Sequence, residues 1–295
     1  IEKPFSKYLI LAYAVFIFLT LSIILPFILL FMSSITDENT LVANGYSFFP
    51  KKFSLASYSY IIKSGGQILK AYGVSIGVTV VGTLLNVLLS ALMAYPLSVK
   101  NLPGRNVMMF FVFFTMLFNG GIVPSYIMWT GTFHIKDTIF AQLLPNFLLS
   151  AWNVMMIRTY FTTSIPDGLY EAAEIDGASQ FTIFWKIVLP LGKPILVTMG
   201  TFAGLAYWND WTNGLYYIVK NTGLYNVQNL LNQMVQNIQF MTQSSNSNVT
   251  AAASTIPATG IQMAIAFVAI LPIMLIFPSF QKYYAKGIAL GAVKG

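Results

Sequence analysis

Six long apolar stretches interrupt this chain, and they constrain its fold more than any other feature. Crossing the roughly 30 Å hydrocarbon layer of a bilayer takes about 20 apolar residues in a helix, because lipid offers no partner for backbone N–H and C=O groups. The stretches run over Tyr8 to Met32, Tyr72 to Leu97, Val107 to Trp129, Thr138 to Ile157, Pro194 to Ile218 and Thr259 to Phe280. We predict an all-α integral membrane protein, a single domain over residues 1–295 built as a bundle of six transmembrane helices.

Composition excludes several functional classes. Hydrophobic residues make up 56% of the chain and charged residues only 8%, against roughly 25% in a soluble domain. The chain has no Cys and a single histidine, His134, so thiolate metal sites, disulfides and histidine metal clusters are excluded. We expect neither a metal nor a cofactor. The basic residues are scattered rather than arranged in a stripe with aromatics, so we expect no nucleic-acid partner.

The positions of Lys and Arg predict the orientation in the membrane, because basic residues are retained in cytoplasmic loops. Six crossings put both termini on one side of the membrane. More of the basic residues lie on that side than on the other. The larger set comprises Lys3, Lys7, Lys100, Arg105, Arg158, Lys186, Lys193, Lys282, Lys286 and Lys294. The opposite set comprises Lys51, Lys52, Lys63, Lys70, Lys136 and Lys220. Both termini are therefore predicted to be cytoplasmic.

Three segments are more than simple connections between helices. A cytoplasmic loop over residues 158–193 holds four of the nine acidic residues, and a cytoplasmic C-terminal tail covers residues 281–295 and is Gly-rich from Lys286. An extracytoplasmic loop over residues 220–258 is rich in Gln, Asn and Ser. Its apolar residues have the spacing of a helix: Leu230, Leu231, Met234, Val235, Ile238 and Met241.

Within the cytoplasmic loop the sequence predicts two short helices joined by a turn. Pro166 suits a first helical position, and Gly177 can end the helix in the left-handed conformation that a residue without Cβ adopts easily. Ser179 could then cap a second helix that reaches toward Ile187, before Pro190 stops it. A solvated connector is the plain alternative for such a charged loop.

The same loop resembles the EAA loop of permeases of binding-protein-dependent ABC importers. Glu171-Ala172-Ala173, three residues, Gly177, nine residues and then Ile187-Val188-Leu189-Pro190 match that signature at each defined position. The resemblance implies the fold of a type I ABC importer permease. It also implies that the loop over residues 166–187 is a coupling helix docking on an ATP-hydrolysing subunit. The contact would then be carried by Glu171, Ala172, Ala173, Asp176 and Gly177.

The resemblance extends to the second permease of maltose-type oligosaccharide importers. It rests on the long last outer loop, on Tyr207-Trp208-Asn209-Asp210-Trp211 and on the ending from Lys286 to Gly295. It implies a multi-pass protein of the bacterial cytoplasmic (inner) membrane. Its implied partners are a second permease, two ATP-binding subunits, an extracytoplasmic solute-binding protein and an oligosaccharide, besides membrane lipid. In that branch the tail reaches between the ATPase subunits and the last outer loop contacts the binding protein.

Polar residues inside the predicted spans suggest a substrate path, because such groups usually face an aqueous interior. Asp210 lies about 24 Å along its span from the inner end, hence toward the outside. The candidates are Tyr207, Trp208, Asn209, Asp210, Trp211, Asn213, Asn119, Gln142 and Asn146. Trp faces and amide groups suit a carbohydrate. The alternative is that these are ordinary interfacial aromatics and a solvated carboxylate.

Asn86 and Ser90 lie four residues apart in the second stretch. For these two side chains we favour hydrogen bonds between neighbouring helices over contact with substrate.

The sequence thus predicts a non-enzymatic permease subunit that works by alternating access. The chain contains no G-x-x-x-x-G-K-[ST] loop, so ATP would be hydrolysed by a partner. Two alternatives remain open. One is a secondary transporter or channel, for which Asp210 would have to carry the ion or proton. The other is an importer permease for a non-sugar solute, since the coupling loop does not discriminate cargo.

Overall fold

The computed structural model describes residues 7–63, 65–243 and 258–292. Within these ranges the regular elements are helices, and the only β pairing is an isolated bridge between Thr36 and Phe53. The chain divides into two compact units. Unit 1 comprises residues 1–68 and 231–273, and unit 2 comprises residues 69–230 and 274–295.

Unit 1 joins the beginning of the chain to a late helix. It contains α1 (Lys7–Ser34), α2 (Glu38–Asn44), α3 (Ala56–Lys63), most of α14 (Val227–Gln243) and the first part of α16 (Ala258–Ala292). The Glu38 carboxylate accepts hydrogen bonds from the backbone N–H groups of Thr259 (2.9 Å) and Gly260 (2.8 Å). These are N–H groups that the first turn of a helix leaves without a partner. An acidic side chain from α2 therefore caps α16.

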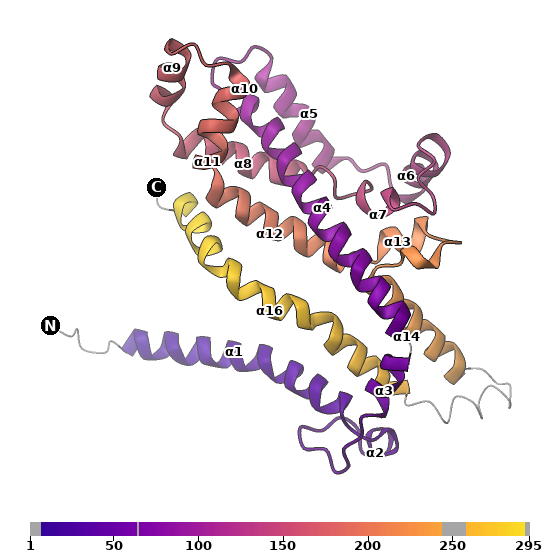
Figure 1. Ribbon diagram of the computed structural model, residues 1–295. Coiled ribbons are helices and arrows are strands. Elements are labelled where there is room, and N and C mark those ends of the chain that lie inside the picture. Colours follow the sequence, from indigo (N-terminus) through magenta and orange to yellow (C-terminus); the bar gives the residue numbers. More distant parts are fainter. Residues whose placement is uncertain (1–6, 64, 244–257, 293–295) are drawn as a thin grey trace. The chain divides into compact units, whose positions relative to one another are not determined.

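Unit 2 is organised along α4 (Gly65–Ser98), which belongs to it from Leu69 onward. Figure 1 shows α9 and α10 near the C-terminal end of α4, and α13 near its N-terminal half. The other elements are α5 (Arg105–Leu117), α6 (Ile122–Ile127), η1 (Met128–Thr132), α7 (Phe140–Leu143), α8 (Ala151–Ser164), α9 (Asp167–Ile175), α10 (Gln180–Ile183), η2 (Phe184–Val188), α11 (Leu189–Leu191), α12 (Lys193–Asn209), α13 (Thr212–Tyr217) and η3 (Thr222–Leu224).

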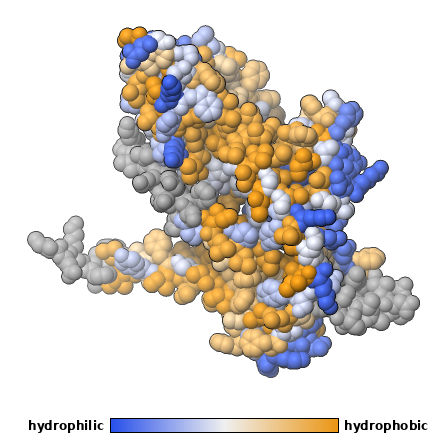
Figure 2. Space-filling view, viewed as in Figure 1, coloured by the Kyte–Doolittle hydropathy of each residue, from blue (hydrophilic) through white to orange (hydrophobic). Residues whose placement is uncertain are grey.

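Apolar surface is exposed on a scale that water would not tolerate. Figure 2 shows hydrophobic residues over much of the visible surface. On α1 Phe16 and Phe18 are 67% and 69% exposed, and on α5 Phe110 and Phe111 are likewise exposed. These side chains carry no polar groups that water could bond, so the exposed faces fit a hydrocarbon environment.

The described helices confirm the apolar, all-helical class but not six continuous crossings. Three are long and apolar enough to cross a membrane: Leu9–Ser34, Gly65–Ser98 and Thr259–Ile276. Two bent pairs could each form one more, giving up to five by length and composition. The pairs are Arg105–Leu117 with Ile122–Thr132, bent by 109°, and Gln180–Leu191 with Lys193–Asn209, bent by 79°.

The stretch predicted as a continuous helix over Thr138 to Ile157 is interrupted in the structure. Helix α7 ends at Leu143 and α8 begins at Ala151. Pro145 lies between them, and Asn146 adopts a positive φ of 67°, which a helix does not permit. The prediction read apolar content correctly, but it missed a Pro-Asn pair typical of a turn.

Two other helix ends also differ from the prediction. The stretch expected to run to Ile218 breaks after Asn209, where Asp210 is extended and α13 begins two residues later. The Gly-rich tail from Lys286 is helical as far as Ala292, because α16 continues through it. The helical spacing predicted for the outer loop is confirmed by α14, while residues 244–257 lie outside the described chain.

Glycine permits a close helix contact in the core of unit 2. A Cβ at Gly82 of α4 would lie against the ring of Tyr207, 2.6 Å from Cε1. The Tyr207 ring is buried, and its hydroxyl donates to the Leu143 carbonyl at 2.9 Å. The contact thus joins α4, α7 and α12.

We therefore expect Gly82→Ala to lower the stability of the protein by about 1–3 kcal/mol, the range typical of overpacking a core. Thermal unfolding of the purified protein in detergent measures the effect. The control is Gly66→Ala on the same helix, where an added Cβ meets nothing within 4 Å. That change should leave the melting temperature unchanged or raise it, because Ala favours a helix over Gly. Equal melting temperatures for the two variants would contradict the contact.

Candidate functional site

The predicted helix-turn-helix of the inner loop is confirmed in its first half. Helix α9 follows Pro166 and ends in the paired hydrogen bonds of a Schellman motif. The Gly177 N–H donates to the Glu174 carbonyl (3.0 Å) and the Ala178 N–H to the Ala173 carbonyl (2.9 Å). Gly177 has a φ of +74°, the left-handed conformation predicted for it. This geometry fixes the direction in which the chain leaves α9.

The second half differs from the prediction at Pro190. Ser179 caps α10 as expected, its Oγ accepting the Thr182 N–H at 3.2 Å. The helix then continues through the π-helical η2 and through Pro190 to Leu191, where the expectation had it stopping before the proline. A proline lacks the N–H that an α-helix needs, and a wider π turn just before it accommodates the lost bond. The chain bends only at Gly192, before α12.

One face of α9 is packed against the membrane helices. Ala173 is buried in a cluster with side chains of α4, α8 and α10. The ring of Tyr170 stacks on that of Tyr95, with centroids 6.3 Å apart. Burial raises the pKa of Tyr170 to about 12. Ala173, one of the five residues expected to contact an ATPase, therefore holds the loop in place rather than offering it contact surface.

Hydrogen bonds also fix α9 to α10. The Tyr95 hydroxyl donates to Gln180 Oε1 (2.6 Å), and Gln180 Nε2 donates to Glu174 Oε1 (2.9 Å). A Cβ at Gly192 would lie 2.5 Å from Phe161 Cε1, so the bend before α12 is packed against α8. Helices α9 to α11 are thereby held to the start of α12.

The opposite face of α9 is exposed. Glu171 and Ala172 of α9 are exposed, and so are Asp176 and Gly177 directly after it. Ile175 is 86% exposed and was missed, although it follows Ala172 at helical spacing. An apolar side chain with charged neighbours on a fixed helix is typical of a docking surface.

Two of the predicted path residues, the buried Asn213 and the exposed Asn146, bond at an interruption in the helices. Asn213 is fully buried, and its Nδ2 donates to the Pro145 carbonyl at 3.0 Å. Asn146 Nδ2 donates to Asn213 Oδ1 at 3.2 Å. The broken segment between α7 and α8 is thus joined to α13. Such bonds are needed because irregular backbone in a membrane has no water to bond.

Asp210 occupies the second interruption, between α12 and α13. Its Oδ1 accepts hydrogen bonds from the Thr212 N–H (3.0 Å), Thr212 Oγ1 (2.7 Å) and the Asn213 N–H (3.3 Å). Its Oδ2 is buried and has no hydrogen-bond partner within the described chain. Asp210 is therefore a helix cap, not the solvated carboxylate of the alternative interpretation.

Two further amides complete this network and were missed in the sequence. Asn226 Nδ2 donates to the Asp210 carbonyl at 2.6 Å, and Asn229 Nδ2 donates to the Trp211 carbonyl. Gln142 Nε2 donates to Asn229 Oδ1 at 3.3 Å. The Asn229 N–H also donates to Asn226 Oδ1, so Asn226 caps α14. An Asn directly before a run of helical apolar spacing was the signal that could have identified it.

The other predicted path residues divide by exposure. Tyr207 and Trp208 are buried between helices, and Asn119 is exposed in a turn where its Oδ1 accepts the Gly121 N–H. Asn209 is exposed, and the Trp211 side chain is 44% exposed. Of the aromatic-amide stretch, only these last two present surface to a ligand.

Asn86 joins helices as predicted. Its Nδ2 donates to the Phe147 carbonyl (2.6 Å) and its Oδ1 accepts from Asn153 Nδ2 of α8 (2.7 Å). Ser90 does not: its buried Oγ has no hydrogen-bond partner in the part of the chain that the structure describes.

Asp137 joins two segments that are distant along the chain, and it was missed in the sequence. Its Oδ1 accepts hydrogen bonds from the backbone N–H groups of Val219 (2.7 Å), Lys220 (2.7 Å) and Asn221 (3.2 Å). The Lys220 N–H is the main cause that holds the pKa of this carboxyl below its usual value. The Asp137 N–H in turn donates to the Tyr217 carbonyl at 3.0 Å.

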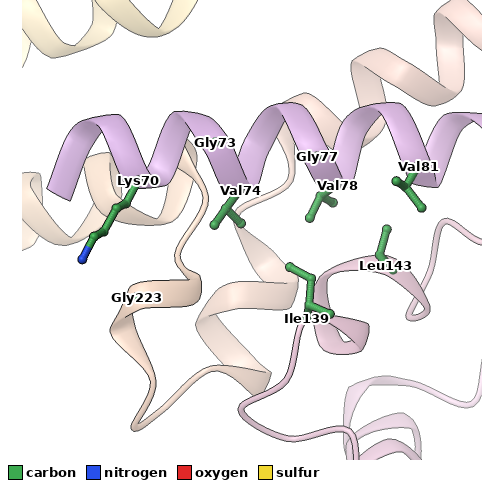
Figure 3. A pocket seen from close by; sticks show the side chains of 9 residues that line it. All are labelled: Lys70, Gly73, Val74, Gly77, Val78, Val81, Ile139, Leu143 and Gly223. Atoms are coloured by element: carbon green, nitrogen blue, oxygen red, sulfur yellow. The ribbon is translucent and has the colours of Figure 1, made fainter. Parts of the chain in front are cut away.

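A cavity of about 560 Å³ lies beside α4. Figure 3 shows Val74 and Val78 of α4 facing Ile139 and Leu143 across it, with Lys70 at one end. None of the predicted path residues lines this cavity.

Known proteins resemble this chain over nearly its full length. Residues 73–290 match the family described as "Binding-protein-dependent transport system inner membrane component". Protein LplC of Bacillus subtilis is 36% identical over 272 residues, covering 92% of this chain and 90% of its own. The polygalacturonan/rhamnogalacturonan transport system permease protein YtcP of the same organism is 36% identical over 285 residues, covering 97% of each chain.

A solved structure has the same fold. It is the crystal structure of a bacterial ABC transporter involved in the import of the acidic polysaccharide alginate. One of its chains matches with a TM-score of 0.79 at 25% identity, covering 96% of this chain and 99% of that one.

We expect substitution of Asn213 to lower the stability of the protein and substitution of Asn209 to leave it unchanged. Asn213→Leu should lower stability by about 1–3 kcal/mol, because the buried Pro145 carbonyl loses its donor. Asn209→Leu should leave the melting temperature in detergent unchanged, because this side chain is exposed. Solute uptake by the reconstituted protein, measured in parallel, should fall in the Asn209 variant if that residue contacts the solute. An unchanged melting temperature in the Asn213 variant would refute the role given to the amide.

Asp137 gives a prediction about pH. The pKa of Asp137 is lower in the folded protein than in the unfolded chain, where it is ~3.9. The stability that the ionised carboxylate contributes is therefore fully present above pH ~3.9, and it is lost as the pH falls through the pKa of the folded protein. At neutral pH, Asp137→Ala should raise hydrogen exchange at the amides of residues 219–221 by about tenfold or more. Asp137→Asn keeps one acceptor and should show a smaller increase. Unchanged exchange in both variants would show that the carboxylate does not hold this segment.

Proposed function

The chain belongs to the family of binding-protein-dependent transport system inner membrane components, and from this membership we propose that it is one of two membrane-spanning subunits of an ATP-driven oligosaccharide importer. Members of this family are multi-pass membrane subunits without enzymatic activity of their own. The proposal includes a second permease, two ATP-binding subunits and an extracytoplasmic solute-binding protein as partners. It also includes six crossings with both termini in the cytoplasm, the fourth made by α8 and the broken segment before it.

The observation that carries the proposal is the fixed, exposed helix α9. Its buried face is held by Ala173 and Tyr170, while Glu171 and Ile175 point away from the core. We infer that this outer face docks on an ATP-binding partner. Because α9 to α11 are bonded to one another and packed at Gly192, movement of the partner would pass to α12 as rotation of a rigid piece. Opening of the transport path would follow from that rotation.

An oligosaccharide is the cargo that the relatives support. YtcP of Bacillus subtilis is the permease of a polygalacturonan/rhamnogalacturonan transport system, and the solved transporter is involved in the import of alginate. In this chain Trp211 offers an exposed aromatic face and Asn209 an exposed amide, the groups that suit sugar rings and hydroxyls. The family favours this class over a secondary transporter or channel, and Asp210, bonded as a helix cap, adds little support for the latter.

Transport energetics test the proposal directly. The complex, copurified from its native membrane and reconstituted in vesicles, should take up oligosaccharide only with ATP and with the binding protein on the outer side. Uptake driven by an ion gradient without ATP would overturn it in favour of a secondary transporter. ATP-driven uptake of a non-sugar solute alone would overturn the assigned cargo.

Charge reversal on α9 tests the coupling surface. We expect Glu171→Lys to reduce ATP-dependent uptake at least tenfold while the variant still reaches the membrane, since reversing a charge in a docking site opposes association. The control is Asn101→Lys, which adds a positive charge at an exposed turn between α4 and α5, outside α9. Copurification of the ATP-binding subunit reports docking separately from transport. Normal copurification and uptake with Glu171→Lys would remove α9 from the proposed interface.

A further inference from the structure

The cavity beside α4 is lined by none of the residues that the proposed function uses. It is open along one side of unit 2, between α4 on one wall and the segment around α7 on the other. Its lining residues are Lys70, Gly73, Val74, Gly77, Val78, Val81, Ile139, Leu143 and Gly223. Asn209 and Trp211, the residues proposed to contact sugar, are not among them.

The groove is apolar along its length and charged at one end. The residues from α4 recur at helical spacing and form one stripe of that helix. Three of its six residues are valines, and a Cβ at Gly73 or Gly77 would meet nothing within 4 Å, so the space in front of both glycines is open. Lys70 is the one charged side chain of the lining and is exposed. Figure 3 shows it at the N-terminal end of the stripe.

The length of the stripe matches one leaflet of a bilayer. Eleven helical steps from Lys70 to Val81 correspond to about 17 Å at 1.5 Å per residue. Half of the hydrocarbon layer measures about 15 Å. In the proposed orientation the span begins at its outer end near Tyr72, so Lys70 lies at the outer interface and Val81 near the middle of the membrane.

We propose that this groove binds one anionic phospholipid of the outer leaflet. The phosphate pairs with the Lys70 ammonium, and an acyl chain lies along Val74, Gly77 and Val81 against Ile139, above the buried pair of Val78 and Leu143. Lysine reaches an interface in this way, with its stem on apolar surface and its charge at the headgroups. The inference goes beyond the proposed function and uses from it only the outward placement of Lys70.

Other occupants fit the lining less well. A sugar needs several donors and acceptors for its hydroxyls, and apart from the Lys70 ammonium the side chains of this lining supply none. A helix of the second permease could pack on the small residues, but helix packing gives no role to a cation at the outer end of the groove. The combination of one cation with a one-leaflet apolar groove is the chemistry of a lipid.

Lipid retention by the assembled importer tests the proposal. The complex is extracted from bilayers of phosphatidylglycerol and phosphatidylcholine in mild detergent, and bound lipids are counted by native mass spectrometry. We expect Lys70→Glu to lower the retained phosphatidylglycerol by about fivefold or more, the effect of one surface lysine. The matched control is Lys63→Glu, an exposed lysine at the end of α3 that does not line the groove. An equal loss of phosphatidylglycerol in the two variants would show that any surface lysine has this effect, and it would overturn the proposed site.

A second variant fills the groove without changing charge. Gly77→Leu has room for its side chain and should lower lipid retention while Lys70 remains, whereas Gly66→Leu, equally free of clashes but outside the groove, should not. Unchanged retention in Gly77→Leu would overturn the proposal. So would loss of the second permease from that complex, which would identify a partner helix as occupant, or a raised KM for sugar with lipid unchanged. ATP-driven uptake by the wild type, recorded in the same bilayers, tests the transport function independently.

Discussion

Irregular backbone in a nonpolar surrounding must find all its hydrogen-bond partners within the protein, and the architecture of unit 2 depends on how it does so. Its apolar segments are broken at Pro145 and at Asp210, and each break frees carbonyl groups. Asn213 bonds the first break and Asn226 bonds the second. Because Asn229 and Gln142 connect these amides further, the two breaks and the start of α14 are joined in one buried network. The positions of α12, α13 and the first turn of α14 thus depend largely on hydrogen bonds to a few backbone carbonyl groups.

At the other end of unit 2 the segment from α9 to α12 depends on small residues. Gly177 turns the chain out of α9, and Gly192 lets the bend before α12 approach Phe161. Between them, Tyr95 and Gln180 tie the loop to α4. A loop outside the membrane would ordinarily be among the more mobile parts of a protein. This one is instead bonded to the membrane helices, so its exposed face has a defined geometry.

A structural feature could be predicted from the sequence when the residues that determine it lie close together along the chain. Apolar runs, the cap at Ser179 and the turn at Gly177 depend on neighbours a few residues away, and they were predicted. The continuous fourth helix was wrong because apolar content outweighed Pro145 and Asn146, whose turn is stabilised by a partner, Asn213, 67 residues or more distant. A similar separation along the chain hid the role of Asp137, whose partners lie more than 80 residues away. The sequence does not show which of these amide side chains are buried. Asn213 and Asn209 have the same side chain and lie four residues apart, yet Asn213 is buried and Asn209 is exposed, and only the packing of the helices distinguishes them.

The cap that Glu38 places on α16 has a consequence for biosynthesis. Its carboxylate meets the N–H groups of Thr259 and Gly260 across more than two hundred residues of chain. Unit 1 is assembled from residues 1–68 and 231–273, so nothing can complete it until the ribosome has made the whole of the segment between. Contacts of such large sequence separation form slowly and late. Helices α1 and α2 are therefore synthesised well before their partner α16, and the Glu38 carboxylate has no helix to cap until α16 has been made.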